Sequence, residues 1–141
     1  MKIAVVRVRG LTGIRRSVKD TLSMVRLYRK NFCIFLEDTP TNRGMVEKIK
    51  DYVTFGMVDE AKFQEYYTKR GEEFLGKTES KNKSIQYHTF VTLNNKNFKP
   101  FLRLNSPKSG FGRKGLKLTF LQGGALGNRG DKISDLIERM L

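Results

Sequence analysis

The chain has 141 residues and carries 28 lysine and arginine side chains against 14 acidic ones, for a formal net charge of +14. That length suits one compact domain, and so large a charge calls for an anionic partner, of which nucleic acid is the most common. The sequence shows neither a run of about 18 apolar residues nor a cleavable apolar leader. We therefore expect a cytoplasmic protein with no membrane partner.

The positive charge lies in two blocks that flank an acidic middle. Residues 1–50 carry 12 basic and 4 acidic side chains, residues 51–80 carry 4 and 7, and residues 81–119 carry 9 and none. An even spread of charge would indicate solubility alone. The uneven spread predicts one face that binds an anionic polymer, with the acidic middle turned away from it.

The first 58 residues alternate between strand and helix patterns. Apolar β-branched residues predict a strand at 3–8, and the apolar runs at 32–36 and 53–58 predict two more. Between them, apolar side chains at steps of three and four predict helices over 14–27 and 42–52. The order β-α-β-α-β predicts an α+β, ferredoxin-like core with its helices on one face of an antiparallel or mixed sheet.

The helix predicted at 14–27 has a basic edge beside its apolar stripe. At about 100° per residue, Arg15, Lys19, Arg26 and Lys30 fall within about 60° of one another. Arg16 lies in the first turn as well, where backbone amides favour a phosphate. This edge is therefore a candidate surface for RNA.

Residues 59–141 form a predicted α/β extension of the core at 1–58. We expect a helix at 59–71, a polar linker at 76–84, a basic loop at 105–117 and a terminal helix at 131–141, with short strands at 101–104 and 118–121. The signals at 85–93 conflict, because some residues favour a strand while the apolar spacing permits a helix. That segment stays open, with the helix as the preferred interpretation.

Three glycines in the basic loop, Gly110, Gly112 and Gly115, have the spacing of a dinucleotide-binding loop. Such a loop follows a strand and opens a helix, whereas the residues after Gly115 favour a strand. A nucleotide-binding enzyme that uses this loop with Asp131 or Asp135 stays the alternative hypothesis. The preferred interpretation is a flexible loop whose four cations approach a sugar-phosphate backbone.

Candidate catalytic and metal-binding residues are few. The chain has a single histidine, His88, and a single cysteine, Cys33, which lies in an apolar run and is expected to be a small buried hydrophobe. One thiol forms no internal disulfide, and one histidine supplies no metal triad. The sequence predicts no enzyme, no metal site, no cofactor and no small-molecule substrate.

The segment from Asp38 to Val46 closely resembles the signature that opens the second helix of the large-ribosomal-subunit protein family L-thirty. The opening strand and its Arg-Gly end, the run from Lys19 to Leu27, and the residues 53–56 also resemble that family. The stretches 102–110 and 123–129 and the terminal helix are similar to the carboxy-terminal half of its longer archaeal and eukaryotic members.

The resemblance implies a ferredoxin-like core buried against large-subunit ribosomal RNA, with an extension beside it and no chemistry of its own. We thus expect a ribosome-bound structural protein that contacts this RNA and neighbouring ribosomal proteins; an RNA chaperone outside the ribosome is a further alternative. One departure is Ser109, since members of the family often have glycine there. The candidate RNA-binding residues are Arg9, Arg15, Arg16, Lys19, Arg26, Arg29, Lys30, Arg43, Lys108, Arg113, Lys114 and Lys117.

Overall fold

A computed structural model describes residues 1–10, 12–77, 79–84, 86 and 90–141. The main elements are β1 (Lys2–Arg7), α1 (Arg16–Met24), β2 (Phe32–Glu37), α2 (Pro40–Lys48), β3 (Val53–Val58), α3 (Glu60–Arg70), β4 (Val91–Leu93), β5 (Lys96–Phe98), β6 (Leu102–Arg103), β7 (Gly127–Asn128) and α4 (Ile133–Met140). Two short 3-10 helices, η1 (Phe120–Gln122) and η2 (Gly130–Lys132), flank β7. In the described chain, no helix is both long and apolar enough to span a bilayer.

Five strands form one mixed sheet in the order β6-β2-β1-β3-β7. β1 is central and pairs antiparallel with β2 and β3, β6 joins β2 antiparallel, and β7 joins β3 parallel. The α+β, ferredoxin-like arrangement predicted from residues 1–58 is therefore confirmed. The extension contributes the strand at each edge of the sheet.

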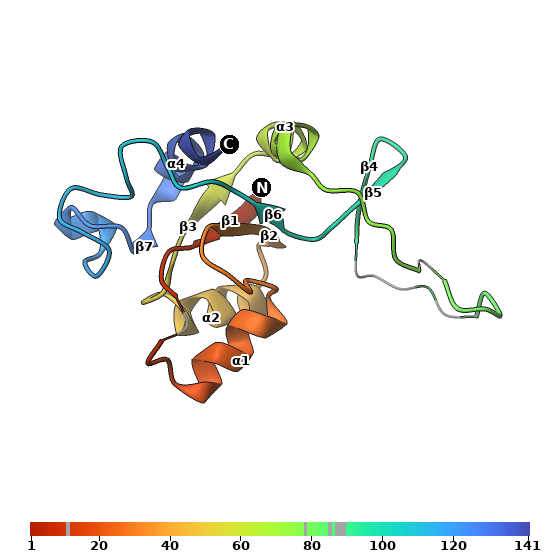
Figure 1. Ribbon diagram of the computed structural model, residues 1–141, viewed down its shortest axis with the longest axis horizontal. Coiled ribbons are helices and arrows are strands. Elements are labelled where there is room, and N and C mark those ends of the chain that lie inside the picture. Colours follow the sequence, from red (N-terminus) through yellow and green to blue (C-terminus); the bar gives the residue numbers. More distant parts are fainter. Residues whose placement is uncertain (11, 78, 85, 87–89) are drawn as a thin grey trace.

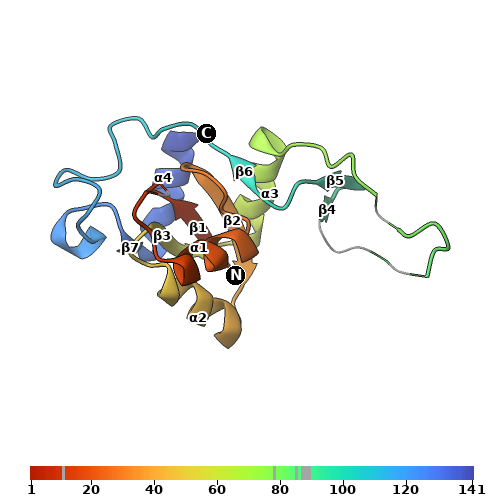
Figure 2. The same cartoon turned by 60° about the horizontal axis from the view of Figure 1, so that its bottom comes forward.

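Helices cover both faces of the sheet (Figures 1 and 2). α1 and α2 lie on one face, where Leu22 and Ile49 pack against Val5 and Ile34. Successive strand residues point to opposite faces, so the neighbours Ala4, Val6 and Cys33 face the other way. There α3 and α4 cover them with aromatic and aliphatic side chains. The core helices occupy one face, as predicted, and the helices of the extension close the other.

α1 is shorter than the predicted helix over 14–27. It ends at Met24, and Arg26 adopts a left-handed conformation with φ of 66°. The backbone N–H of Leu27 donates to the Leu22 carbonyl at 2.9 Å and that of Arg26 to the Ser23 carbonyl at 3.1 Å, which is a Schellman ending. The side chain of Leu27 is fully buried, so core packing fixes this early end.

α2 is displaced toward the amino terminus from the predicted range 42–52. Thr39 caps it by accepting a hydrogen bond from the backbone N–H of Asn42 at 3.3 Å, and Pro40 occupies the first helical position. The helix ends at Lys48, and the N–H of Tyr52 then donates to the Ile49 carbonyl at 2.9 Å in a turn that enters β3.

A long arm projects from the sheet between α3 and β6 (Figure 1). Within 85–93, where a helix was preferred, residues 91–93 form β4 instead, while 85 and 87–89 lie outside the described residues. β4 pairs with β5 through Asn94 and Asn95, both of which have positive φ, as a type I′ hairpin turn requires. The Asn-Asn pair was the signal for a hairpin.

The segment from Leu118 to Leu121, predicted as a strand, contains only a bridge at Thr119 before η1 begins. The carbonyl of Leu118 accepts from the N–H groups of both Ala125 and Leu126, at 2.9 and 3.1 Å. Gly123, with φ of 89°, reverses the chain between them. Local hydrogen bonding thus folds this segment into a compact turn.

Candidate RNA-binding surface

A pocket of about 340 Å³ brings together cations from three separate segments of the chain. It is called here the Arg9 pocket and is lined by Arg9, Gly10, Thr12, Lys30, Leu116 and Lys117. Arg9 follows β1, Lys30 precedes β2, and Lys117 comes from the basic loop. Its described lining has three cations and no carboxylate, which suits an anionic ligand.

The guanidinium of Arg9 is held in place by groups at the start of β3. Its Nη1 donates to the Asp51 carbonyl at 3.3 Å, and its Cζ lies 5.1 Å from the centre of the Tyr52 ring. The backbone N–H of Arg9 also donates to the Tyr52 carbonyl at 3.1 Å. These partners are neutral, so they orient the side chain without cancelling its charge.

Gly10 allows Lys30 to lie close to the end of β1. A Cβ atom on Gly10 would approach Cε of Lys30 to 3.3 Å, a tight contact that would push the lysine stem aside. The absence of a side chain at Gly10 therefore leaves room for the Lys30 side chain beside the Arg9 pocket.

The predicted basic edge of α1 is divided by the structure. Arg15, Arg16 and Lys19 are exposed at the start of the helix, and its first turn contains no acidic residue. Arg26 and Lys30, predicted on the same edge, lie beyond the end of the helix at Met24. The continuous four-residue edge was thus wrong because α1 stops early, although Lys30 reaches the Arg9 pocket by another route.

Arg43 is an exposed residue of α2 that pairs with Asp38 through two hydrogen bonds, from Nε to Oδ1 and from Nη2 to Oδ2. Hydrogen bonding by Arg43 holds the pKa of Asp38 below its usual value, and the same contact raises the pKa of Arg43. Part of the charge of Arg43 is therefore matched within the protein. Arg29, by contrast, is exposed in the turn before β2.

The basic loop is exposed but anchored to α4. Nη1 of Arg139 donates to the carbonyls of Lys108 and Gly110, at 2.9 and 2.8 Å. The N–H of Lys114 donates to the Gly123 carbonyl at 3.1 Å. Arg113, Lys114 and Lys117 are all exposed on this framework, and Lys117 also lines the Arg9 pocket.

Two arginines that the sequence analysis left unassigned are buried structural groups. Arg7 is 1% exposed and donates from Nη1 to the Leu27 carbonyl at 2.6 Å and from Nε to the Arg9 carbonyl at 2.9 Å. Burial lowers the pKa of Arg7. Its place in an apolar strand was the only sequence signal for this role.

Arg129 is the second buried arginine, at 6% exposure. It donates to the hydroxyl of Thr54 at 2.8 Å and to the carbonyls of Phe111 and Ala125 at 2.6 and 3.1 Å. Its Cζ lies 4.7 Å from the centre of the Phe120 ring. Burial, with a smaller contribution from the charge of Arg139, lowers its pKa to about 10.

The glycine pattern at 110–115 lacks the surroundings of a nucleotide-binding loop. Gly115 is followed by irregular chain and then by η1, not by an α-helix whose amino terminus faces the loop. The nucleotide-binding alternative is therefore not favoured. In the described part of the chain, no three His, Cys, Asp or Glu side chains are grouped as a metal would require.

Comparison with known proteins places these features in one family. The family model described as ribosomal protein L30p/L7e matches residues 3–53. Large ribosomal subunit protein uL30 of Nanoarchaeum equitans is 40% identical, over 98% of this chain and 97% of that protein. The uL30 proteins of Methanopyrus kandleri and Methanococcus maripaludis are 36% and 38% identical, over 94% and 100% of this chain and 99% and 100% of theirs. With its mixed sheet, its anchored extension and this similarity over nearly its whole length, the chain belongs to the uL30 family of ribosomal proteins.

Proposed function

We propose that this chain is a structural, non-catalytic constituent of the large ribosomal subunit that binds and stabilises ribosomal RNA through basic side chains. The observation that carries the proposal is the Arg9 pocket, where three segments far apart in sequence place cations around one cavity with no carboxylate in its described lining. The names of the uL30 relatives support the large subunit as the assembly.

The chemistry of the Arg9 pocket suits a phosphodiester. The guanidinium of Arg9 is oriented before RNA arrives, so little side-chain entropy is lost on binding. Lys30 and Lys117 add two further positive charges to the lining of the pocket. Each phosphate contact of this kind releases condensed counterions, which makes the affinity depend on salt.

The remaining predicted contact residues complete the RNA-binding surface in our proposal. The start of α1 offers exposed cations next to backbone N–H groups that no side chain caps. The anchored basic loop offers three more. The proposed contact residues outside the pocket are Arg15, Arg16, Lys19, Arg26, Arg29, Arg43, Lys108, Arg113 and Lys114.

Equilibrium binding of the full chain to a large-subunit RNA fragment at several salt concentrations tests this proposal. Three duplex phosphate contacts in the Arg9 pocket alone contribute about −2.7 to the slope of log affinity against log salt, and the other proposed contacts make the slope of the full chain steeper. Arg9→Gln and Lys30→Gln should each reduce the steepness by about 0.9. Lys62→Gln is the control, because it removes the same charge from α3 and Lys62 does not line the pocket.

A flat salt dependence of the unmodified chain, or equal slopes for the pocket variants and the control, contradicts the proposal. The location is tested separately by sedimentation of native extracts. We expect the protein in the large-subunit fraction of the cytoplasm, beside other ribosomal proteins. Recovery mainly as free protein would favour the alternative of an RNA chaperone outside the ribosome.

We further propose that 1–58 and 59–141 act as a core and an extension that fold as one unit. The helix, linker, basic loop and terminal helix of the extension were predicted at 59–71, 76–84, 105–117 and 131–141. The placement of β6 and β7 at the two edges of the core sheet supports this division of labour. A single cooperative unfolding transition of the whole chain is the expected result.

A further inference from the structure

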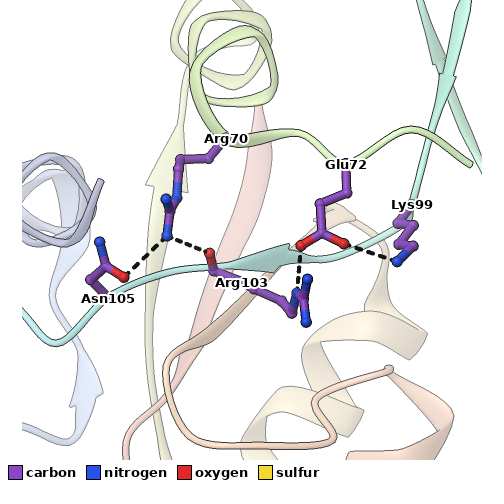
Figure 3. A network of polar contacts seen from close by, with 5 residues as sticks. All are labelled: Arg70, Glu72, Lys99, Arg103 and Asn105. Carbon is purple, nitrogen blue, oxygen red and sulfur yellow. Dashed lines mark hydrogen bonds and ion pairs between the residues drawn. The ribbon is translucent and has the colours of Figure 1, made fainter.

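A second pocket lies at the carboxy-terminal end of α3, next to β6 and the residues that follow β6. Figure 3 shows the polar side chains of this region. The pocket has a volume of about 470 Å³ and is called here the Arg70 pocket, lined by Lys69, Arg70, Gly71, Glu72, Arg103, Leu104 and Asn105. It shares no lining residue with the Arg9 pocket. None of its residues is among the twelve predicted contacts.

The charges around this pocket do not cancel. Glu72 is the single carboxylate of the network in Figure 3, and it bonds both Lys99, at 2.9 Å, and Arg103. Nη2 of Arg70 donates to two neutral acceptors, the carbonyl of Arg103 at 3.1 Å and Oδ1 of Asn105 at 3.2 Å. The network therefore contains one carboxylate and three cations, Arg70, Lys99 and Arg103, and its net charge is +2.

Arg70 also has an unused donor. Its Nε is buried and has no hydrogen-bond partner in the described chain. An unpaired buried N–H is unfavourable, and guanidinium groups bind best to oxyanions that accept two parallel hydrogen bonds. A small movement of Arg70 toward an oxyanion in the pocket would satisfy this donor.

The Arg70 pocket is continuous with the basic part of the extension. The chain passes from Arg103 and Asn105 directly into the basic loop, whose last residues, Leu116 and Lys117, line the Arg9 pocket. Residues 81–119 contain no acidic side chain. One uninterrupted basic segment therefore joins the two cavities, which favours a polyanion over a separate small ligand.

We propose that the Arg70 pocket binds a backbone phosphate of ribosomal RNA, as a contact separate from the Arg9 pocket. The proposal rests on the function proposed above and extends it to the end of α3, within the segment 51–80 that the charge pattern had turned away from RNA. Arg70 and Arg103 contact the phosphate, and Glu72 positions Arg103 while weakening the local attraction.

Two variants and one control test the pocket in the same salt-dependent binding assay with the full chain. Arg70→Gln should make the salt slope less steep by about 0.9, whereas the control Lys62→Gln, on the same helix, should leave it within about 0.3 of the original value. Glu72→Gln should tighten binding two- to fivefold, about the effect of removing one negative charge near a solvated phosphate.

The Glu72→Gln variant keeps the test decisive if Arg70→Gln fails to fold. A purely structural role for the network predicts that loss of Glu72 weakens RNA binding, so weaker or unchanged binding overturns the inference. An unchanged slope for a folded Arg70→Gln variant overturns it too. If subunits reconstituted with that variant instead lack a neighbouring protein, the pocket binds an acidic protein segment and the inference is again wrong.

The Arg9→Gln variant separates this inference from the proposed function. A less steep salt slope for Arg9→Gln, with no change in slope for Arg70→Gln, would exclude the contact at the Arg70 pocket and leave the proposed function standing. Unchanged slopes for both variants remove the proposed RNA-binding function as well.

Discussion

Nε of Arg129 donates a 2.8 Å hydrogen bond to Oγ1 of Thr54, and this hydroxyl in turn donates to the carbonyl of Gly127 at 3.0 Å. The two residues are 75 positions apart in the chain. Their contact fastens the turn around β7 to the buried strand β3. Arg129, to which the sequence analysis assigned no role, is therefore part of the protein's internal framework.

Replacing this arginine should therefore destabilise the protein. Arg129→Met removes the hydrogen bonds that the charged guanidinium donates. The carbonyls of Phe111 and Ala125 then lose this donor. We expect the free energy of unfolding to fall by about 3 kcal/mol. Urea denaturation followed by circular dichroism measures this free energy. The control is Lys132→Gln, a substitution of an exposed residue nearby. A decrease of less than about 1 kcal/mol for Arg129→Met would contradict the structural role.

Two glycine substitutions should have opposite effects. A Cβ on Gly56 of β3 would lie 2.1 Å from the carbonyl oxygen of Gly130, whereas a Cβ on Gly44 of α2 meets no atom within 4 Å. Gly56→Ala should cost at least about 2 kcal/mol through overpacking. Gly44→Ala should stabilise by up to about 1 kcal/mol through helix propensity. Thermal unfolding of both variants tests these two expectations. Equal midpoint temperatures for the two variants would show that the close approach at Gly56 is absent.

Low pH should destabilise the root of the arm, which is the place where Glu72 pairs with Lys99 and Arg103. Hydrogen bonds from Lys99 and then Arg103 hold the pKa of Glu72 below the ordinary 4.5. Because the folded pKa lies below the unfolded one, Glu72 stabilises the fold above about pH 4.5, and this stabilisation is lost as the pH falls through the folded pKa.

Amide hydrogen exchange measures that loosening. The N–H of Phe74 donates to the Asn97 carbonyl, and the N–H of Lys99 to the Glu72 carbonyl, each at 2.8 Å. After correction for intrinsic rates, both amides should lose protection below pH 4.5 in the natural chain. In Glu72→Gln their protection should be lower throughout and independent of this titration. Identical pH profiles in the two proteins would mean that the ion pairs do not stabilise the root.

Cys33 should resist thiol reagents in the folded protein. It is fully buried between β1 and β6 on the face covered by α3 and α4, and burial raises the pKa of its thiol. We expect reaction with a disulfide reagent at pH 8 only at the rate of unfolding. Reaction within seconds under native conditions would place this thiol at the surface.

Sequence patterns predicted the core because its signals are local and agree with one another. Apolar alternation marked β1, and the apolar runs at 32–36 and 53–58 marked β2 and β3. The buried state of Cys33 was also predicted and is confirmed. In each case the residue's own surroundings in sequence contain the information.

The errors arose where packing and hydrogen bonds, not the spacing of apolar residues, decide where an element ends. The end of α1 depends on burial of Leu27, and the turn after Leu118 depends on hydrogen bonds from Ala125 and Leu126. Neither is visible in the periodicity of the segment itself. The sequence patterns also assigned no role to Arg7 and Arg129, which burial and hydrogen bonding make part of the protein's interior.

The position of β6 and β7 at the two edges of the sheet has a consequence during synthesis. The first 58 residues leave the translating ribosome with the outer edges of β2 and β3 unpaired and with Ala4, Val6 and Cys33 bare on one face. Unpaired edges and bare apolar faces invite association between chains. At typical elongation rates, about ten seconds pass before the last helix arrives to cover them. The nascent chain therefore has an interval in which a chaperone that shields β-edges would raise the yield of native protein.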